Sequence, residues 1–267
     1  TYLAVGPDGL IDLDALRDAI TDRTVLVSVM AVNNEIGVIA RLREIGALCR
    51  ERGVLFHTDA AQAAGKIPLD VAAMNIDLMS ISGHKIYGPK GVGAIYIRRR
   101  PRVRLVPLLS GGGQEEGIRS GTLAPAQCVG IGDACRLAGL EMADDFERIQ
   151  GLYRAFLDGL FSRLDGIRLN GHEQERFPGN INLSFNGVDG DLLIAGMRDL
   201  AVSSGAACAS AVKEPSYVLA ALGLSKAEAS ASIRFGFGRF TTEAEISHAV
   251  ATVAGHVERL RAEDNKI

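Results

Sequence analysis

Residues 76–85 have the sequence Ile-Asp-Leu-Met-Ser-Ile-Ser-Gly-His-Lys, an apolar stretch that ends in small and basic residues. Two comparable apolar stretches come earlier in the chain, at residues 24–30 and 53–58. Short and nearly continuous apolar stretches are typical of parallel strands buried on both faces. These three stretches therefore predict the central strands of a parallel sheet.

Helical periodicity appears before the first strand-like stretch, at residues 12–20, and between the first two, at residues 42–52. Strands that alternate with helices indicate βαβ units and a mostly parallel sheet. The pattern changes near residue 140. We expect an α/β domain over residues 1–140 and a smaller α+β domain over residues 141–267. Further expected elements are strands at residues 94–97, 181–185 and 232–237, and helices at residues 125–164 (with breaks), 191–200 and 242–261.

The composition is that of an ordinary globular chain. Its 267 residues are 47% hydrophobic and 23% charged, which is sufficient for a hydrophobic core. The 29 basic and 32 acidic residues give a net charge of −3, without the basic excess typical of nucleic-acid-binding proteins. No apolar run reaches the length of about 20 residues that a membrane-spanning helix needs. We expect neither nucleic acid nor a membrane among its partners.

One basic cluster stands out, Arg98-Arg99-Arg100 with Arg102 and Arg104. It follows an apolar strand-like run. We interpret it as the solvated end of a strand.

The four cysteines form no CxxC pair, which indicates free thiols in a reducing compartment and favours the cytoplasm. Cys49, Cys128 and Cys135 lie in segments with helical spacing, so we expect all three to be buried or half-buried. Cys208 lies in a run of small residues, 203–210, without helical or strand periodicity. We expect an accessible loop there, and an exposed thiol can act as a nucleophile once ionised.

Polar residues follow the predicted strands at one edge of the sheet. Asn34, Asp59 and Lys85 each come after a strand end, where parallel sheets bind ligands. A lysine among glycines suits a Schiff base to an aldehyde cofactor, and pyridoxal phosphate also needs a carboxylate for its ring nitrogen. Asp59 can supply that carboxylate. A phosphate-binding loop of the Walker type is excluded, because Pro89 stands where that motif requires lysine.

A zinc site is the competing interpretation of His57, Asp59, His84 and Cys208, all of which are metal-ligating residue types. It is disfavoured because His57 lies inside an apolar run, where a half-buried and hydrogen-bonded histidine is expected. We therefore expect no metal.

Arg234 alternates along a predicted strand with Ile233 and Phe235, so its side chain is expected on the opposite face. There it can bind a carboxylate through two N–H groups, or simply face solvent. The alternation alone leaves both roles open.

Five motifs occur in one order along the chain: Asn33-Asn34-Glu35-Ile36-Gly37, His57-Thr58-Asp59-Ala60-Ala61-Gln62, Ser82-Gly83-His84-Lys85-Ile86-Tyr87-Gly88-Pro89-Lys90-Gly91, Arg119-Ser120-Gly121-Thr122 and Ser203-Ser204-Gly205-Ala206-Ala207-Cys208. This order resembles the cysteine desulfurases of the IscS/NifS type, which are pyridoxal-phosphate enzymes of fold type I. The resemblance runs from residue 1 to about residue 262 and lacks the N-terminal portion of that family. Alanines at positions 206 and 209 depart from the more polar family motif.

The resemblance implies a role for each candidate residue. Lys85 binds the cofactor covalently and moves the substrate's α-proton, and Cys208 takes the sulfur. The resemblance also implies that Asp59 contacts the pyridine nitrogen, Gln62 contacts the phenolate oxygen, and Asn34 lies near the ring and the substrate. Ser82 and His84 hold the phosphate together with Thr122 of the partner subunit. Arg234 binds the substrate carboxylate.

The implied activity converts L-cysteine to L-alanine and leaves a persulfide on Cys208. A homodimer is implied, with an iron–sulfur scaffold or another sulfur-acceptor protein as partner. The alternatives are a selenocysteine lyase, another enzyme of this fold such as an aminotransferase, or an inactive fragment or scaffold chain. Because the N-terminal portion is not matched, we expect residues 1–267 alone to bind the cofactor weakly and to lack activity.

Overall fold

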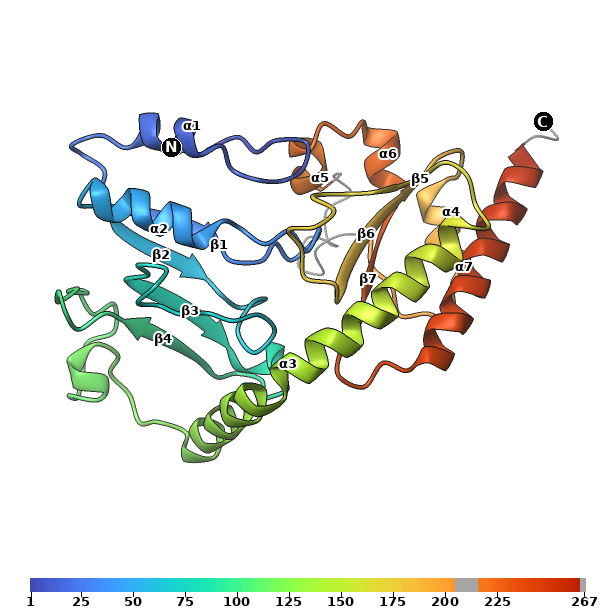
Figure 1. Ribbon diagram of the computed structural model, residues 1–267. Helices are drawn as coiled ribbons and strands as arrows, with labels where there is room; N and C mark the ends of the chain where they lie inside the picture. Colours follow the sequence, from blue (N-terminus) through green and yellow to red (C-terminus); the bar gives the residue numbers. More distant parts are fainter. Residues whose placement is uncertain (205–215, 265–267) are drawn as a thin grey trace. The chain divides into compact units, whose positions relative to one another are not determined.

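A computed structural model describes residues 1–204 and 216–264 (Figure 1). The chain divides into two compact units, each treated by itself below. Unit 1 comprises Thr1–Ala19, Val32–Ala40 and Ala143–Ile267, and unit 2 comprises Ile20–Ala31 and Arg41–Met142. The expected assignment of a cofactor domain to residues 1–140 and a small domain to residues 141–267 stays a prediction.

Unit 2 is built on a four-stranded sheet in the order β1-β2-β3-β4. Three strands run parallel, β1 (Leu26–Met30), β2 (Leu55–Asp59) and β3 (Leu78–Ser82), and β4 (Gly93–Ile97) pairs antiparallel with β3. The helix α2 (Leu42–Glu51) connects β1 to β2 and packs against β2 (Figure 1). The predicted α/β fold with a mostly parallel sheet is confirmed.

Apolar burial explains the local structure of unit 2. Phe56 of β2 is fully buried, and α2 turns Leu42, Ile45 and Leu48 inward at the spacing of successive helical turns. In parallel strands the carboxyl ends meet at one edge. The ends of β2 and β3 are therefore neighbours, with Asp59 opposite Ser80 in the register.

The basic cluster after β4 is not uniformly solvated. Arg98 is buried and forms an ion pair with Asp77, with 2.9 Å between Nε and Oδ1. It also donates to the carbonyl of Ile76 at 2.8 Å. The expectation of a solvated strand end is wrong for Arg98, because a buried acid 21 residues away neutralises its charge, whereas Arg99 forms an exposed ion pair with Glu116.

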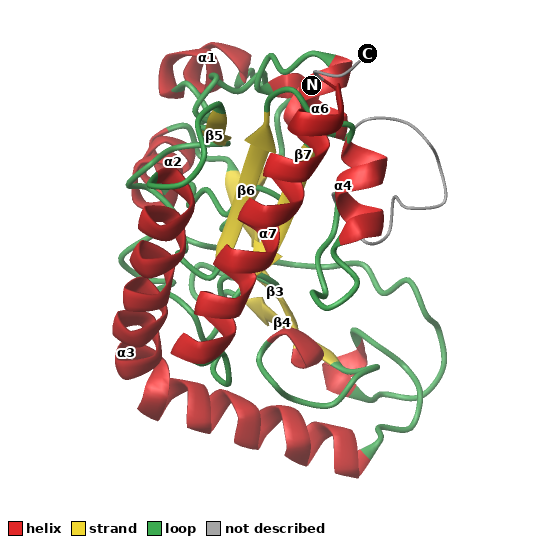
Figure 2. Ribbon diagram, turned by 90° about the vertical axis from the view of Figure 1, so that its right-hand side faces the viewer, coloured by secondary structure: helices red, strands yellow, loops and turns green. Residues whose placement is uncertain are grey.

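Unit 1 contains an antiparallel sheet in the order β5-β6-β7, formed by Ile167–Leu169, Asn180–Phe185 and Ser232–Gly236. The helix α7 (Glu243–Asp264) runs beside β6 and β7 (Figure 2). The helix α3 (Pro125–Phe161) contributes its C-terminal part to this unit.

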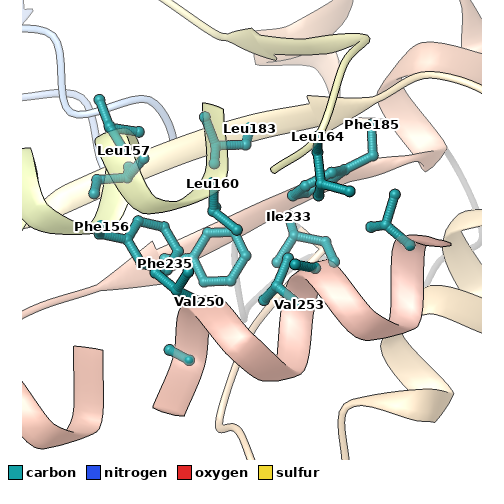
Figure 3. Close-up of a cluster of buried hydrophobic side chains, with 14 of the residues drawn as sticks. Phe156, Leu157, Leu160, Leu164, Leu183, Phe185, Ile233, Phe235, Val250 and Val253 are labelled. Atoms are coloured by element: carbon teal, nitrogen blue, oxygen red, sulfur yellow. The ribbon is translucent and has the colours of Figure 1, made fainter. Parts of the chain in front are cut away.

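An apolar core joins these elements of unit 1 (Figure 3). Phe156 and Leu160 of α3 are fully buried and lie among side chains from the strands and from α7. The rings of Phe156 and Phe235 are 4.9 Å apart between centroids. The sheet contributes Ile181, Leu183, Phe185, Ile233 and Phe235, and α7 contributes Ile246, Ala249, Val250, Val253, Ala254 and Val257.

The remaining elements are short: α1 (Leu13–Ala19), the 3-10 helices η1 (Gly83–Lys85) and η2 (Glu115–Gly117), α4 (Gly190–Gly196), α5 (Tyr217–Ala221) and α6 (Lys226–Ser230). The periodicity predicted α1 and α4 but not β5, α5 or α6. A capping box at Ser225 and Glu228 begins α6, and this pattern is visible in the sequence.

The three described cysteines differ in their exposure to solvent. Cys49 on α2 is buried, as expected, but Cys128 and Cys135 are both exposed. The prediction is wrong for these two because helical spacing does not say which face of α3 is covered. Within residues 1–204 and 216–264, no helix combines the length and apolar character needed to cross a membrane.

Candidate active site

The end of β2 in unit 2 forms the first part of the candidate site. Asp59 is the last residue of the strand, and its Oδ1 accepts a hydrogen bond from the backbone N–H of Ala61 at 2.8 Å. The chain then makes a helical turn over residues 60–67, in which Ala64 N–H donates to the carbonyl of Ala60 at 2.8 Å. The N–H of Ala60 donates to the carbonyl of Ser80 at 2.9 Å, which ties this turn to β3.

His57 lies two residues before Asp59 and bridges three strands. Its Nδ1 is 2.7 Å from Oγ of Ser28, and its Nε2 is 2.9 Å from Oγ of Ser80. Burial lowers the pKa of His57, and the nearby carboxylate of Asp59 opposes that shift. A neutral imidazole between two hydroxyls is the satisfied, half-buried histidine expected from its place in an apolar run.

The metal alternative gains no support from the described part of the chain. Residues 1–204 and 216–264 contain no group of three or more histidine, cysteine and acidic side chains placed to hold an ion. Cys208, one of the four ligands considered, lies outside the described residues.

Gln62 and Lys66 project from the turn that follows Asp59. The ammonium of Lys66 donates to Oε1 of Gln62 at 3.2 Å. Burial lowers the pKa of Lys66 to about 8, and the positive charge of nearby Lys85 acts in the same direction. Gln62 was expected at the site, but Lys66 was missed; its position four residues after Gln62, one helical turn further on, is the signal that could have indicated it.

The end of β3 carries the remaining candidate residues of the sheet edge, Ser82, His84 and Lys85. Ser82 ends the strand, and its Oγ is 3.0 Å from Nδ1 of His84. Gly83, His84 and Lys85 form η1, in which His84 and Lys85 are exposed. The N–H of Gly88 returns to the carbonyl of Gly83 at 2.9 Å and closes this turn.

Thr122 lies in an exposed segment of unit 2 after η2. Ser120 in the same segment donates from Oγ to the carbonyl of Gly112 at 2.8 Å, and Gly121 N–H donates to Oε1 of Gln114 at 3.2 Å. The Gly-rich segment is therefore ordered by contacts within itself. The expected role of Thr122 at a partner's phosphate stays a prediction.

Unit 1 carries Asn34 and Arg234. Asn33 begins a turn in which its Oδ1 accepts from Glu35 N–H at 2.9 Å, and the turn closes at Gly37 with a φ of +73°. A Cβ at Gly37 would lie 2.4 Å from the carbonyl oxygen of Asn180, so only glycine fits. The turn presents the backbone carbonyl of Asn34, which accepts from Asn180 Nδ2 at 3.0 Å.

Arg234 lies on β7 on the face opposite to the core, as the alternation with Ile233 and Phe235 predicted. It is half-buried, and its Nη1 donates to the carbonyl of Asn34 at 2.8 Å. Its backbone exchanges two hydrogen bonds with Ser203, at 2.7 and 3.3 Å. The guanidinium therefore has a fixed direction rather than a purely solvent-facing one.

The structure thus gathers the predicted residues into two groups. Asp59, Gln62, Ser82, His84 and Lys85 lie in unit 2 at the ends of β2 and β3, and Asn34 and Arg234 lie together in unit 1. Cys208 lies outside the described residues.

Comparisons with known proteins give one consistent result. Residues 1–248 match the family model described as aminotransferase class-V. The cysteine desulfurase IscS of Rickettsia bellii is 56% identical over 261 residues, which are 98% of this chain and 64% of that protein. The chain thus spans less than two thirds of the length of this curated relative.

Two solved structures have the same fold. A NifS-like protein from Rickettsia africae superposes with a TM-score of 0.86 at 26% identity, covering 96% of this chain and 69% of that one. SspA, solved in complex with cysteine, superposes with a TM-score of 0.77 at 34% identity, covering 91% of this chain and 67% of that one.

Proposed function

This chain belongs to the class-V aminotransferase family, and we propose that it acts as a pyridoxal-phosphate-dependent cysteine desulfurase. The observation that carries the proposal is the set of side chains at the neighbouring ends of β2 and β3 and in the turns that follow them: a carboxylate, a hydroxyl, an imidazole and two amines. The name of the Rickettsia bellii relative and the cysteine bound to SspA support L-cysteine as the substrate.

The residues at this edge of the sheet fit the cofactor chemically. A phosphate needs N–H and O–H donors in a positive environment, and Ser82, His84, Lys66 and Lys85 provide them. A protonated ring nitrogen needs a carboxylate, and Asp59 ends the neighbouring strand. We assign Ser82 and His84, together with Thr122 of the partner subunit, as ligands of the phosphate. We assign Asp59 as the partner of the ring nitrogen.

When bound, pyridoxal phosphate supplies an electron sink for bond cleavage at the substrate. Lys85 holds the cofactor through Nζ and afterwards carries a proton to and from the substrate's α-carbon at the same atom. Gln62 donates to the phenolate oxygen, and Asn34 lines the substrate. These roles use residues whose backbones are anchored by strand ends and short turns.

Arg234 binds the carboxylate of the substrate. Its Nη1 donates to the carbonyl of Asn34, which holds one side of the guanidinium and leaves further N–H groups for two-point binding. The Cys208 thiol takes the sulfur as a persulfide. One thiol hydrogen stays on the persulfide and the other ends in the methyl group of alanine, so no external oxidant or reductant is required.

We further propose a homodimer that works in the cytoplasm and passes sulfur to an iron–sulfur scaffold or another acceptor protein. Three described cysteines, Cys49, Cys128 and Cys135, are free thiols, which supports a reducing compartment. Sedimentation of the cofactor-loaded protein tests the dimer; a monomer at micromolar concentration contradicts it.

The decisive experiment measures alanine released from L-cysteine by a complete enzyme that contains residues 1–267 and carries pyridoxal phosphate, because residues 1–267 alone are expected to lack activity. Cys208→Ala is expected to retain the yellow cofactor and to lose alanine release, whereas the matched control Cys135→Ala keeps both. Borohydride reduction and peptide mapping are expected to place the cofactor on Lys85. A label on Lys66 or Lys90, or alanine release unchanged in Cys208→Ala, contradicts the assignment. Turnover of selenocysteine but not cysteine supports the lyase alternative instead.

A further inference from the structure

We propose that Lys66 is a positioning residue that orients the side-chain amide of Gln62 and thereby decides which end of that amide faces the cofactor. The inference rests on the function proposed above, and it adds a residue that the sequence did not single out for the site. Its basis is the contact between the two side chains in the turn after β2.

The contact has a defined polarity. Nζ of Lys66 lies 3.2 Å from Oε1 of Gln62, four residues earlier in the helical turn. An ammonium group has three donors and no acceptor, whereas a glutamine amide has a carbonyl at one end and an NH2 group at the other. Lys66 can therefore bind only the carbonyl end. The NH2 end of Gln62 must point away from it.

The backbone around Lys66 fixes its place. Gly65 adopts a φ of +67°, and a Cβ there would lie 2.8 Å from Cβ of Ala138 and 3.2 Å from Cγ2 of Ile86. The N–H of Lys66 donates to the carbonyl of Ala63 at 3.0 Å. The lysine side chain is half-buried and is repelled by the charge of Lys85, so the Gln62 carbonyl is a stabilising acceptor for it.

The orientation matters for the chemistry assigned to Gln62. A phenolate oxygen is an acceptor, and a charge-assisted hydrogen bond from an NH2 group stabilises its ionised form. A reversed amide would turn carbonyl lone pairs toward the same oxygen and repel it. By occupying the carbonyl, Lys66 selects the orientation that donates.

The test uses the complete enzyme that contains residues 1–267, loaded with pyridoxal phosphate, and the pH titration of its visible absorption. Lys66→Met is expected to raise the pKa of the bound chromophore by about one unit or more, the shift that corresponds to one lost charge-assisted hydrogen bond. Cofactor affinity is expected to fall about tenfold. Lys66→Arg, which keeps donors and positive charge, is expected to restore most of both.

A double-mutant cycle separates orientation from charge. If Lys66 acts through Gln62, Lys66→Met causes no further chromophore shift in a Gln62→Ala background. An equal shift in both backgrounds overturns the inference, because the lysine charge then acts on the cofactor directly. The exposed Lys90→Met is the control for loss of one positive charge and is expected to leave the titration unchanged.

Failure of the proposed function gives a different result. In that case the complete enzyme without substitutions binds no pyridoxal phosphate and has no visible absorption to titrate. An unshifted chromophore in Lys66→Met, with the cofactor bound normally on Lys85, overturns the positioning role and leaves the desulfurase proposal standing.

Discussion

The hydroxyl of Ser216 donates a hydrogen bond to the buried carboxylate of Glu35, 181 residues earlier in the chain. The same Ser216 oxygen accepts from the N–H groups of Val218 and Leu219 and so caps α5. Glu35 belongs to the turn that presents the carbonyl of Asn34 to Arg234. One serine therefore links a helix start to the segment that positions the proposed substrate-binding arginine.

Ser216→Ala is expected to lower the free energy of unfolding by about 2–4 kcal/mol. The substitution removes a helix cap, worth roughly 1 kcal/mol, and leaves a buried carboxylate without its hydroxyl donor. Urea unfolding measures the change. Ser225→Ala is the matched control, because Ser225 caps α6 without contacting a buried charge. Equal losses in the two variants contradict the role of Glu35.

Gly65→Ala is expected to destabilise the protein by about 2 kcal/mol or more, because a positive φ and a close approach to Ala138 both disfavour a Cβ. Gly139→Ala in α3 is the matched control. Apart from the adjoining backbone of α3 itself, no described atom lies within 4 Å of a Cβ there, and alanine favours a helix over glycine by roughly 0.5–1 kcal/mol. Thermal unfolding compares the two; a Gly65→Ala variant as stable as Gly139→Ala refutes the packing argument.

The thiols are expected to differ sharply in reactivity. Burial raises the pKa of Cys49 to about 11, with the nearby charge of Asp77 adding to the shift. At pH 8 only roughly one Cys49 side chain in a thousand is then ionised to the thiolate, which is the reactive form. Iodoacetamide followed by peptide mapping should label the exposed Cys128 and Cys135 in the native protein, and Cys49 only after unfolding. Native labelling of Cys49 at the rate of Cys135 contradicts its burial.

Lys66 makes stability depend on pH in the alkaline range. Its pKa is about 8 in the folded protein, against 10.5 for an ordinary lysine, so the unfolded chain binds more protons between these values. The free energy of unfolding therefore rises with pH across that window. Lys66→Met removes this rise, so its stability relative to the parent should fall by about 1–2 kcal/mol from pH 7 to pH 10, a figure reduced for solvent screening.

Urea unfolding at both pH values measures this difference. Lys90→Met is expected to show no such dependence, since Lys90 is exposed. The raised pKa of Cys49 makes the free energy of unfolding fall with pH above about pH 9. This effect is the same in the parent and in both variants, so it cancels in the comparison. A constant difference between Lys66→Met and the parent would show that Lys66 titrates normally.

The amino-acid sequence alone determined the parallel strands of unit 2 and the residues at their ends. Each strand is a local apolar run, and a run of this kind identifies both the buried segment and the polar residues that end it. Alternation along residues 232–236 also predicted the face of Arg234, because side chains of a strand alternate by geometry. The five sequence motifs indicated the family, and the match of residues 1–248 to the family model confirms it.

Only the tertiary structure decided which partner each side chain meets. Arg98 is buried because Asp77 lies beside it, and Cys128 and Cys135 are exposed because the described chain does not cover their face of α3. Lys66 orients Gln62, and Ser216 contacts Glu35 across 181 residues. Local periodicity records which residues avoid water. The choice of hydrogen-bond and ion-pair partners depends on how segments distant in the chain pack together, and no local pattern contains that information.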